Sequence, residues 1–208
     1  MTTHAKIIGV YEIIGGALGA IMMAFNWIAQ FKESPSEFLL GDSPNVFLFT
    51  VNSLLGFIFF LICAYAGFRL YERKISGYHL SIWIQALQIP KIMIGGFAYF
   101  FSAGLYLLFG INEVGNFGFF LSTSITGFQF GFVSGESIYS FSINVLALFL
   151  CIYLVRLSRL RDIEVRLSNL KTCPFCSANL AFDKETVLKK EGIFCTSCKN
   201  VIRFTDLK

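Results

Sequence analysis

Residues 80–109 have the sequence LSIWIQALQIPKIMIGGFAYFFSAGLYLLF, and the way this stretch folds decides the architecture of the chain. It exceeds the roughly 20 apolar residues that one bilayer crossing needs, and Pro90 and Lys91 interrupt it. In one interpretation, residues 78–89 form an interfacial helix and a spanning helix begins at Pro90, because proline suits the first turn of a helix. In the other, a single kinked helix holds Lys91 deep in the bilayer, paired with Glu12. We favour the first interpretation.

The composition of the whole chain also indicates a membrane protein. Of its 208 residues, 55% are hydrophobic and 14% are charged, whereas an average soluble domain is about 25% charged. So little charge does not cover the surface of a soluble globule, and the composition argues against a cytosolic enzyme, a disordered chain and a secreted disulfide scaffold. Four segments are long and apolar enough to cross a bilayer, namely residues 7–29, 46–68, 80–109 (or 91–109) and 138–157.

The charges between these segments alternate in sign. Basic residues lie before the first segment (Lys6), after the second (Arg73 and Lys74) and after the fourth, whereas residues 110–137 carry Glu113 and Glu136 but no lysine or arginine. The positive-inside rule then places both termini in the cytoplasm. We therefore predict an all-α transmembrane domain of four helices over residues 1–157, multi-pass in the cell (inner) membrane and surrounded by lipid. A cleaved signal peptide is the alternative for the first segment, whose apolar run is longer than the usual 7–15 residues of a signal peptide.

Four cysteines near the C-terminus form the most specific motif of the sequence. Cys173, Cys176, Cys195 and Cys198 have the spacing C-x₂-C-x₁₈-C-x₂-C, which is typical of a structural zinc site. Two short knuckles can turn four thiolates toward one ion, and the residues between them fit a small β-hairpin. Residues 172–208 are too few to bury a core of their own, so metal binding would supply the folding free energy.

This tail resembles the zinc-ribbon family, with two rubredoxin-like knuckles. The resemblance covers residues 172–208 and implies a β-ribbon that binds structural Zn²⁺, without implying an activity. Ser177 and Lys199 stand where the family commonly has glycine. Iron is the alternative metal for the same ligands. A redox-active pair of C-x-x-C motifs lacks a thioredoxin-like context, and disulfides do not suit a cytoplasmic tail.

Residues 157–171 join the fourth segment to the ribbon and contain neither glycine nor proline. Their apolar residues recur at heptad-like spacing on a continuing helix, which predicts a helical stalk. Such a seam can join subunits of a homo-oligomer, or it can pack on the ribbon or a loop of the same chain. The seam residues are Leu160, Ile163, Leu167 and Leu170.

Two further features fall within or between the expected spans. Glu12 and Lys91 are intramembrane polar candidates, since ionisable residues inside a bilayer are often functional; snorkelling toward the interface is the alternative for Glu12. Residues 110–137 form an outer loop rich in phenylalanine, and residues 126–132 alternate with the period of a strand. This loop can pack on the span ends, dip into the outer leaflet, or contact a partner. Its candidate contact residues are Phe128, Phe130 and Phe132.

These features lead us to expect an integral membrane adaptor or sensor that forms homo-oligomers and docks a cytoplasmic protein through its ribbon. The layout of four spans and a docking tail is similar to that of membrane components of bacterial anti-phage systems of the Kiwa type, which implies a role in defence. The alternative is a pore or transporter subunit with a polar path between helices. We expect no enzyme, since no catalytic motif occurs, and no nucleic-acid partner, because anionic lipid explains the excess of basic residues.

Overall fold

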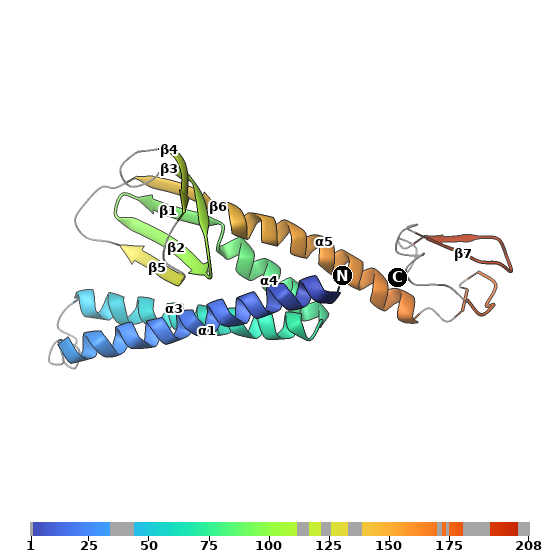
Figure 1. The fold of residues 1–208 in the computed structure, drawn as a ribbon, viewed down its shortest axis with the longest axis horizontal. Coiled ribbons are helices and arrows are strands. Elements are labelled where there is room, and N and C mark those ends of the chain that lie inside the picture. Colours follow the sequence, from blue (N-terminus) through green and yellow to red (C-terminus); the bar gives the residue numbers. More distant parts are fainter. Residues whose placement is uncertain are drawn as a thin grey trace. The chain divides into compact units, whose positions relative to one another are not determined.

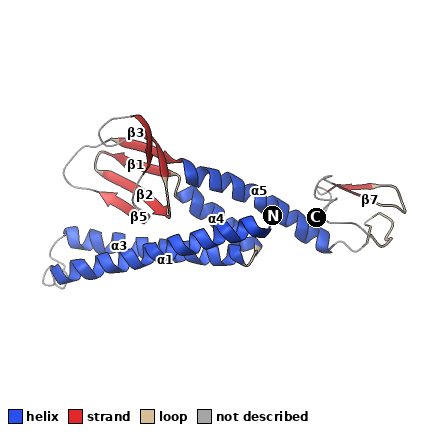
Figure 2. Cartoon of the chain, viewed as in Figure 1, coloured by secondary structure: helices blue, strands red, loops and turns tan. Residues whose placement is uncertain are grey.

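The computed structural model describes residues 2–33, 44–111, 117–121, 126–132, 139–169, 172–173, 175–180 and 192–203. The chain divides into two compact units, Met1–Val155 and Arg156–Lys208. The first unit combines a hairpin of two long helices, a shorter helix and a six-stranded sheet (Figure 1, Figure 2). The second unit contains the end of the last helix and a small two-stranded ribbon.

Helices α1 (Thr2–Glu33) and α3 (Pro44–Tyr71) lie side by side over their whole lengths (Figure 1). Small residues permit this close approach, because a Cβ added to Gly16 would lie 2.5 Å from the backbone nitrogen of Ala64. Thr3–Lys32 and Leu48–Tyr71 are both long and apolar enough to cross a membrane. The first two expected spans, residues 7–29 and 46–68, therefore both lie within long helices.

Helix α4 (Ile75–Leu87) follows the hairpin after a short turn. It ends just before Pro90, as the interpretation with a separate helix ahead of that proline required. Proline often marks the end of a helix, because it has no backbone N–H and because it restricts the conformation of the residue before it. The hydroxyl of Tyr99 donates a hydrogen bond of 2.7 Å to the carbonyl oxygen of Leu87 and so ties the end of this helix to the sheet.

The sheet is antiparallel throughout, with the strand order β4-β3-β6-β1-β2-β5. Its strands β4 and β5 form the two edges. The predicted strand over residues 126–132 is confirmed as β5. The six strands are β1 (Pro90–Ile94), β2 (Phe97–Ala103), β3 (Leu107–Ile111), β4 (Phe117–Leu121), β5 (Thr126–Phe132) and β6 (Ser140–Asn144).

The expectation of an all-α domain with four spanning helices is wrong, because residues 90–111 form three strands. Gly95 and Gly96 have φ angles of 56° and 88°, and they form the two-residue turn between β1 and β2. Positive φ at both positions is the geometry of a type I′ hairpin turn, which glycine adopts without steric cost. The aromatic residues of this segment also favour a strand. The apolar run therefore packs as a sheet and not as a third span.

The fourth expected span, residues 138–157, is also wrong. Its first part is strand β6, and helix α5 (Val145–Asn169) begins only afterwards. Asn144 marks the change, since its side-chain oxygen accepts a hydrogen bond of 3.3 Å from the backbone N–H of Ala147 and so caps the helix. In the described part of the chain, only the two hairpin helices are long and apolar enough to span.

The core of the first unit lies between the helical hairpin and the sheet. Phe60 of α3 and Phe101 of β2 are completely buried, and their ring centroids are 5.4 Å apart. Phe128 of β5 joins the same cluster. The side-chain oxygen of Asn52 on α3 accepts a hydrogen bond of 2.8 Å from the backbone N–H of Phe130, so the hairpin satisfies a donor on an edge strand.

The second unit contains strands β7 (Gly192–Phe194) and β8 (Val201–Arg203), which pair antiparallel. Ile202 is buried. An isolated β-bridge joins Thr172 to Asn179. The bridge flanks the first cysteine motif and the two strands flank the second, while residues 181–191 of the expected hairpin between the motifs lie outside the described residues.

Candidate metal centre

The four C-terminal cysteines converge in the second unit. Their sulfur atoms all lie within 4.8 Å of one another. Two of the distances, from Cys173 Sγ to Cys198 Sγ and from Cys176 Sγ to Cys195 Sγ, are 3.7 Å. A tetrahedral zinc ion with Zn–S bonds of about 2.3 Å separates its ligand sulfurs by about 3.8 Å. The cluster therefore has dimensions that fit a tetrathiolate metal site.

Two equivalent knuckles place these sulfurs. In the first, the N–H of Cys173 donates to Ala178 O at 2.8 Å, and the N–H of Ser177 donates to Cys173 O at 2.8 Å. In the second, the N–H of Cys195 donates to Asn200 O at 3.0 Å, and the N–H of Lys199 donates to Cys195 O at 2.9 Å. The same pair of bonds at the same spacing shows that both C-x-x-C motifs fold into one kind of turn.

Each knuckle contains one residue in the left-handed region. Ser177 has a φ of 56° and Lys199 a φ of 57°. These are the two positions at which zinc-ribbon sequences commonly have glycine. For an L residue this conformation costs about 1–2 kcal/mol. The knuckles thus keep the glycine geometry without glycine, and the ribbon carries local strain at both turns.

The ligand set differs in exposure and in charge. Cys173 and Cys195 are buried, whereas Cys176 is exposed. Backbone N–H groups of Cys198 and Ser197 point at the Cys195 sulfur and lower the pKa of that thiol to about 6. A thiolate is the form that binds a metal, so this shift favours coordination by Cys195, whereas the pKa of the Cys176 thiol in the same cluster is raised to about 12. Four such ligands fill a tetrahedral shell and leave no position for a catalytic water, which fits a structural ion.

Glu12, an intramembrane polar candidate, is completely buried in the first unit. Its Oε2 accepts a hydrogen bond of 2.5 Å from the Ser81 hydroxyl, and its Oε1 accepts one of 2.9 Å from the Gln85 amide. Both partners lie on α4, so the carboxyl group links α1 to that helix. Among the described residues, no cation contacts the Glu12 side chain.

Lys91, the other polar candidate, does not pair with Glu12. It lies on strand β1, half-buried, with its ammonium group 5.8 Å from the ring centroid of Phe100. The structure therefore does not bring the two intramembrane polar candidates together.

The remaining candidate residues have separate environments. Leu160 and Ile163 lie on α5 and are half-buried. The backbone of Leu167 lies on the same helix, but its side chain and the whole of Leu170 fall outside the described residues. Phe128 is buried in the core and Phe130 is exposed, while Phe132 pairs with Phe97 through its backbone and its side chain is not described.

The sequence did not identify the partners of Glu12. Ser81 and Gln85 are one turn apart on α4 and both are buried, as is Gln88, whose side-chain oxygen accepts a hydrogen bond of 3.0 Å from the backbone N–H of Ala103. The sequence did contain a signal for these partners, namely polar residues at helical spacing within an apolar segment. Their separation from Glu12 along the chain concealed the contact.

Comparison with known proteins adds no relative. No family model, curated protein or solved structure matches this chain. The resemblance to Kiwa-type membrane components rested on a layout of four spans, which the fold does not have, and no family match supports it. The four-cysteine cluster is thus the only recognisable motif in the described residues.

Proposed function

We propose that this chain is an integral membrane adaptor or sensor that presents a zinc-loaded ribbon to a cytoplasmic protein. The observation that supports it most is the convergence of four sulfurs within 4.8 Å in a unit separate from the apolar helices. A tetrathiolate ion would fold a segment too small to have its own core. Zinc ribbons serve many proteins as contact modules, and a closed ligand shell suits such a role better than catalysis.

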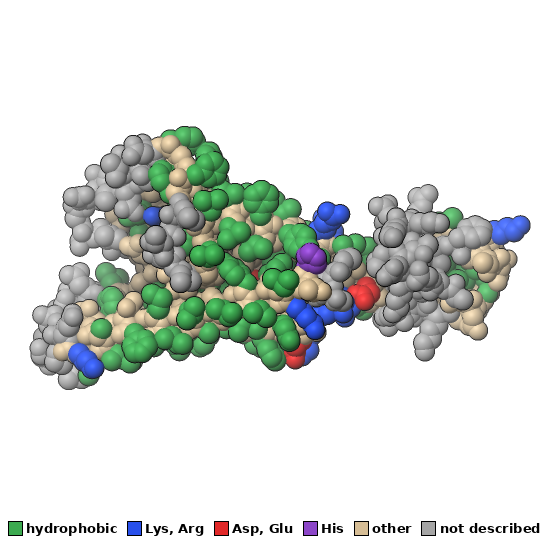
Figure 3. Space-filling view, viewed as in Figure 1, with side chains coloured by type: hydrophobic (Ala, Val, Ile, Leu, Met, Phe, Trp, Pro, Cys, Tyr) green, Lys and Arg blue, Asp and Glu red, His purple; other side chains and the backbone are tan. Residues whose placement is uncertain are grey.

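The surface of the helical hairpin supports insertion in a membrane. Large apolar side chains are exposed along both helices, as the green surface in Figure 3 illustrates. A soluble protein rarely exposes an apolar patch of this extent. The exposed residues include Ile7, Ile14, Ile21, Phe25 and Ile28 on α1, and Leu54, Ile58, Leu61, Tyr65 and Phe68 on α3.

The charges at the hairpin ends support an orientation. Lys6 lies near the start of α1, and Arg69 and Lys74 lie at and just after the end of α3, so one end of the hairpin is basic. By the positive-inside rule, this end faces the cytoplasm of a cell whose inner membrane holds the hairpin. The segment that links the two helices carries Glu37 and Asp42 in its sequence, which suits the opposite side.

The sheet supports assembly into a homo-oligomer. Phe117 and Phe119 on edge strand β4 are 70% and 66% exposed, and Phe141 on β6 is 51% exposed. Beside a membrane-spanning hairpin, an open sheet edge cannot face lipid, because its backbone N–H and C=O groups would lack partners. Other copies of the chain would cover this edge and its aromatic side chains.

A pull-down with the full-length protein in detergent tests the adaptor role. Tagged wild type, Cys173→Ser and Cys151→Ser proteins are each incubated with lysate of the native host. Cys151 belongs to the first unit and is a matched control for loss of one thiol. We expect one protein to be recovered by wild type and Cys151→Ser but not by Cys173→Ser. Equal recovery by all three proteins, or no specific recovery by wild type, would refute docking through the ribbon.

A further inference from the structure

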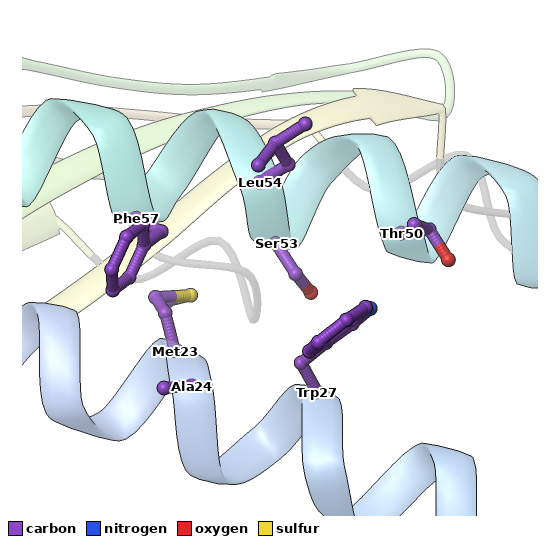
Figure 4. A pocket seen from close by; sticks show the side chains of 7 residues that line it. All are labelled: Met23, Ala24, Trp27, Thr50, Ser53, Leu54 and Phe57. Carbon is purple, nitrogen blue, oxygen red and sulfur yellow. The ribbon is translucent and has the colours of Figure 1, made fainter.

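A cavity of about 300 Å³ lies between α1 and α3. Met23 and Trp27 line it from α1, and Thr50, Ser53 and Phe57 line it from α3 (Figure 4). A water molecule occupies about 30 Å³ in the liquid, so the cavity is far larger than a packing defect of a protein interior. Its size is at the lower end of ligand pockets, which are mostly apolar with a few polar groups.

The surface of the cavity is almost entirely apolar, although the residues that line its two ends differ. The Thr50 and Ser53 hydroxyls and the Trp27 indole lie toward one end, whereas Met23 and Phe57 lie at the other end (Figure 4). Thr50 and Phe57 are seven positions apart, which corresponds to about 10 Å along a helix. The end with Trp27 is nearer the last turn of α1. An apolar surface of this kind matches the acyl chain of a lipid.

We propose that the cavity binds one acyl chain of a membrane phospholipid, with the headgroup at the level of Trp27 and Thr50. The proposal rests on the membrane location proposed above. Leu54 and Trp27, which line the cavity, are 59% and 44% exposed, so it is continuous with the apolar outer surface of the hairpin. Tryptophan is enriched at the level of lipid headgroups, and Trp27 lies at the end of the cavity nearer the last turn of α1.

The dimensions favour an acyl chain over other occupants. A helix of a second copy has a diameter of about 10–12 Å and does not enter a cavity of this volume. Water does not fill a cavity with predominantly apolar walls. A flexible hydrocarbon chain enters from the side of the hairpin and gains contacts along both helices. The chain would thereby become part of the packing between α1 and α3.

Two tryptophans make the site directly measurable. Trp27 lines the cavity, whereas Trp83 lies on α4, is 69% exposed and does not line it. Trp83→Phe leaves Trp27 as the sole tryptophan, and Trp27→Phe leaves Trp83 as a matched reporter of ordinary lipid contact. Full-length protein in maltoside micelles is titrated with brominated phosphatidylglycerol, and quenching of tryptophan fluorescence is recorded. We expect Trp27 to be quenched with saturation at a low lipid fraction, and Trp83 to be quenched in proportion to that fraction.

Variants of the cavity test its location. Ser53→Leu fills the cavity from α3 and Ala24→Leu fills it from α1, while Ser53→Ala keeps its volume. These changes are made in the Trp83→Phe protein, whose sole tryptophan is Trp27. We expect the saturable quenching of Trp27 to disappear in both leucine variants and to persist in Ser53→Ala. Proportional quenching of Trp27, or a saturable phase that survives in a folded leucine variant, would overturn the proposal.

The same proteins separate this proposal from the membrane location. In vesicles of brominated phosphatidylglycerol, Trp27 is quenched if the hairpin lies in the bilayer, and Trp83 is quenched as well if α4 also contacts lipid. Quenching of neither one would refute the membrane location and the lipid site together. Quenching of Trp27 in vesicles, without saturation for Trp27 in micelles, would refute the lipid site alone.

Discussion

Glu12 Oε2 and Ser81 Oγ lie 2.5 Å apart, completely buried, and join α1 to α4. Gln85 completes the arrangement with a bond of 2.9 Å to Oε1. A polar group buried without a partner costs far more than one that is paired, so these contacts specify how α4 packs on the hairpin. The carboxyl group acts in the structure as a hydrogen-bond acceptor between helices.

Removing the Glu12 carboxyl group should destabilise the first unit. Glu12→Ala leaves Ser81 and Gln85 buried without their partner, and each unsatisfied group costs about 1–3 kcal/mol. Glu12→Gln replaces the carboxyl group with an amide of the same shape, which can still form a hydrogen bond with Ser81. We expect the free energy of unfolding in detergent to fall for Glu12→Ala and to change much less for Glu12→Gln.

Glu72→Ala is the control for this pair of variants. Glu72 forms an ion pair of 2.6 Å with Lys74 after the end of α3, and both side chains reach solvent. A surface pair of this kind contributes about 0–1 kcal/mol. If Glu12→Ala were no more destabilising than Glu72→Ala, the buried contact would not hold α4 in place.

The approach of α1 and α3 gives a second prediction. A Cβ on Gly16 would lie 2.5 Å from Ala64 N and 2.6 Å from Phe60 O, so Gly16→Ala must push the backbones of α1 and α3 apart. Overpacking of this kind costs about 1–3 kcal/mol. Gly118 on β4 has no atom within 4 Å of such a Cβ, and Gly118→Ala should be neutral or slightly stabilising. Thermal unfolding of the two variants should move in opposite directions or differ by at least several degrees, and equal midpoints would contradict the close packing.

The knuckle turns give a third prediction. Glycine at position 177 or 199 removes the left-handed strain, which is about 1–2 kcal/mol, while adding backbone entropy to the unfolded chain of about 0.5–1 kcal/mol. The net gain predicts that Ser177→Gly binds zinc a few-fold more tightly in competition with a chelator. Ser177→Ala lacks the hydroxyl but keeps the strain, and it should not tighten binding. Tighter binding by both variants would show that the side chain, and not the backbone, sets the affinity.

The ribbon could be predicted from the sequence because its information is local. Two C-x-x-C motifs fix both the ligands and the knuckle turns, and the structure brings Cys173 and Cys198 within 3.7 Å. The first two expected spans were also correct as helices, since long apolar runs without internal turn signals favour a helix. Each of these features depends on residues that are close together along the chain.

The sheet could not be predicted by the same reasoning. A continuous apolar run does not show a period of its own, so strands with apolar side chains on both faces resemble a spanning helix. Gly95-Gly96 forms the hairpin turn between Ile94 and Phe97. The aromatic residues around it, at a two-residue glycine turn, were the signal that favoured strands. The contact of Glu12 with α4 was hidden because it joins residues far apart in the sequence.

Metal analysis of the full-length protein, purified without chelator, tests the zinc ribbon most directly. We expect about one zinc ion per chain in the wild type, as a closed tetrathiolate site holds. The same content should remain in Cys151→Ser, and zinc should be lost from Cys173→Ser and Cys198→Ser. Wild-type protein that contains no metal, or that contains iron in place of zinc, would refute the zinc ribbon on which the proposed function rests.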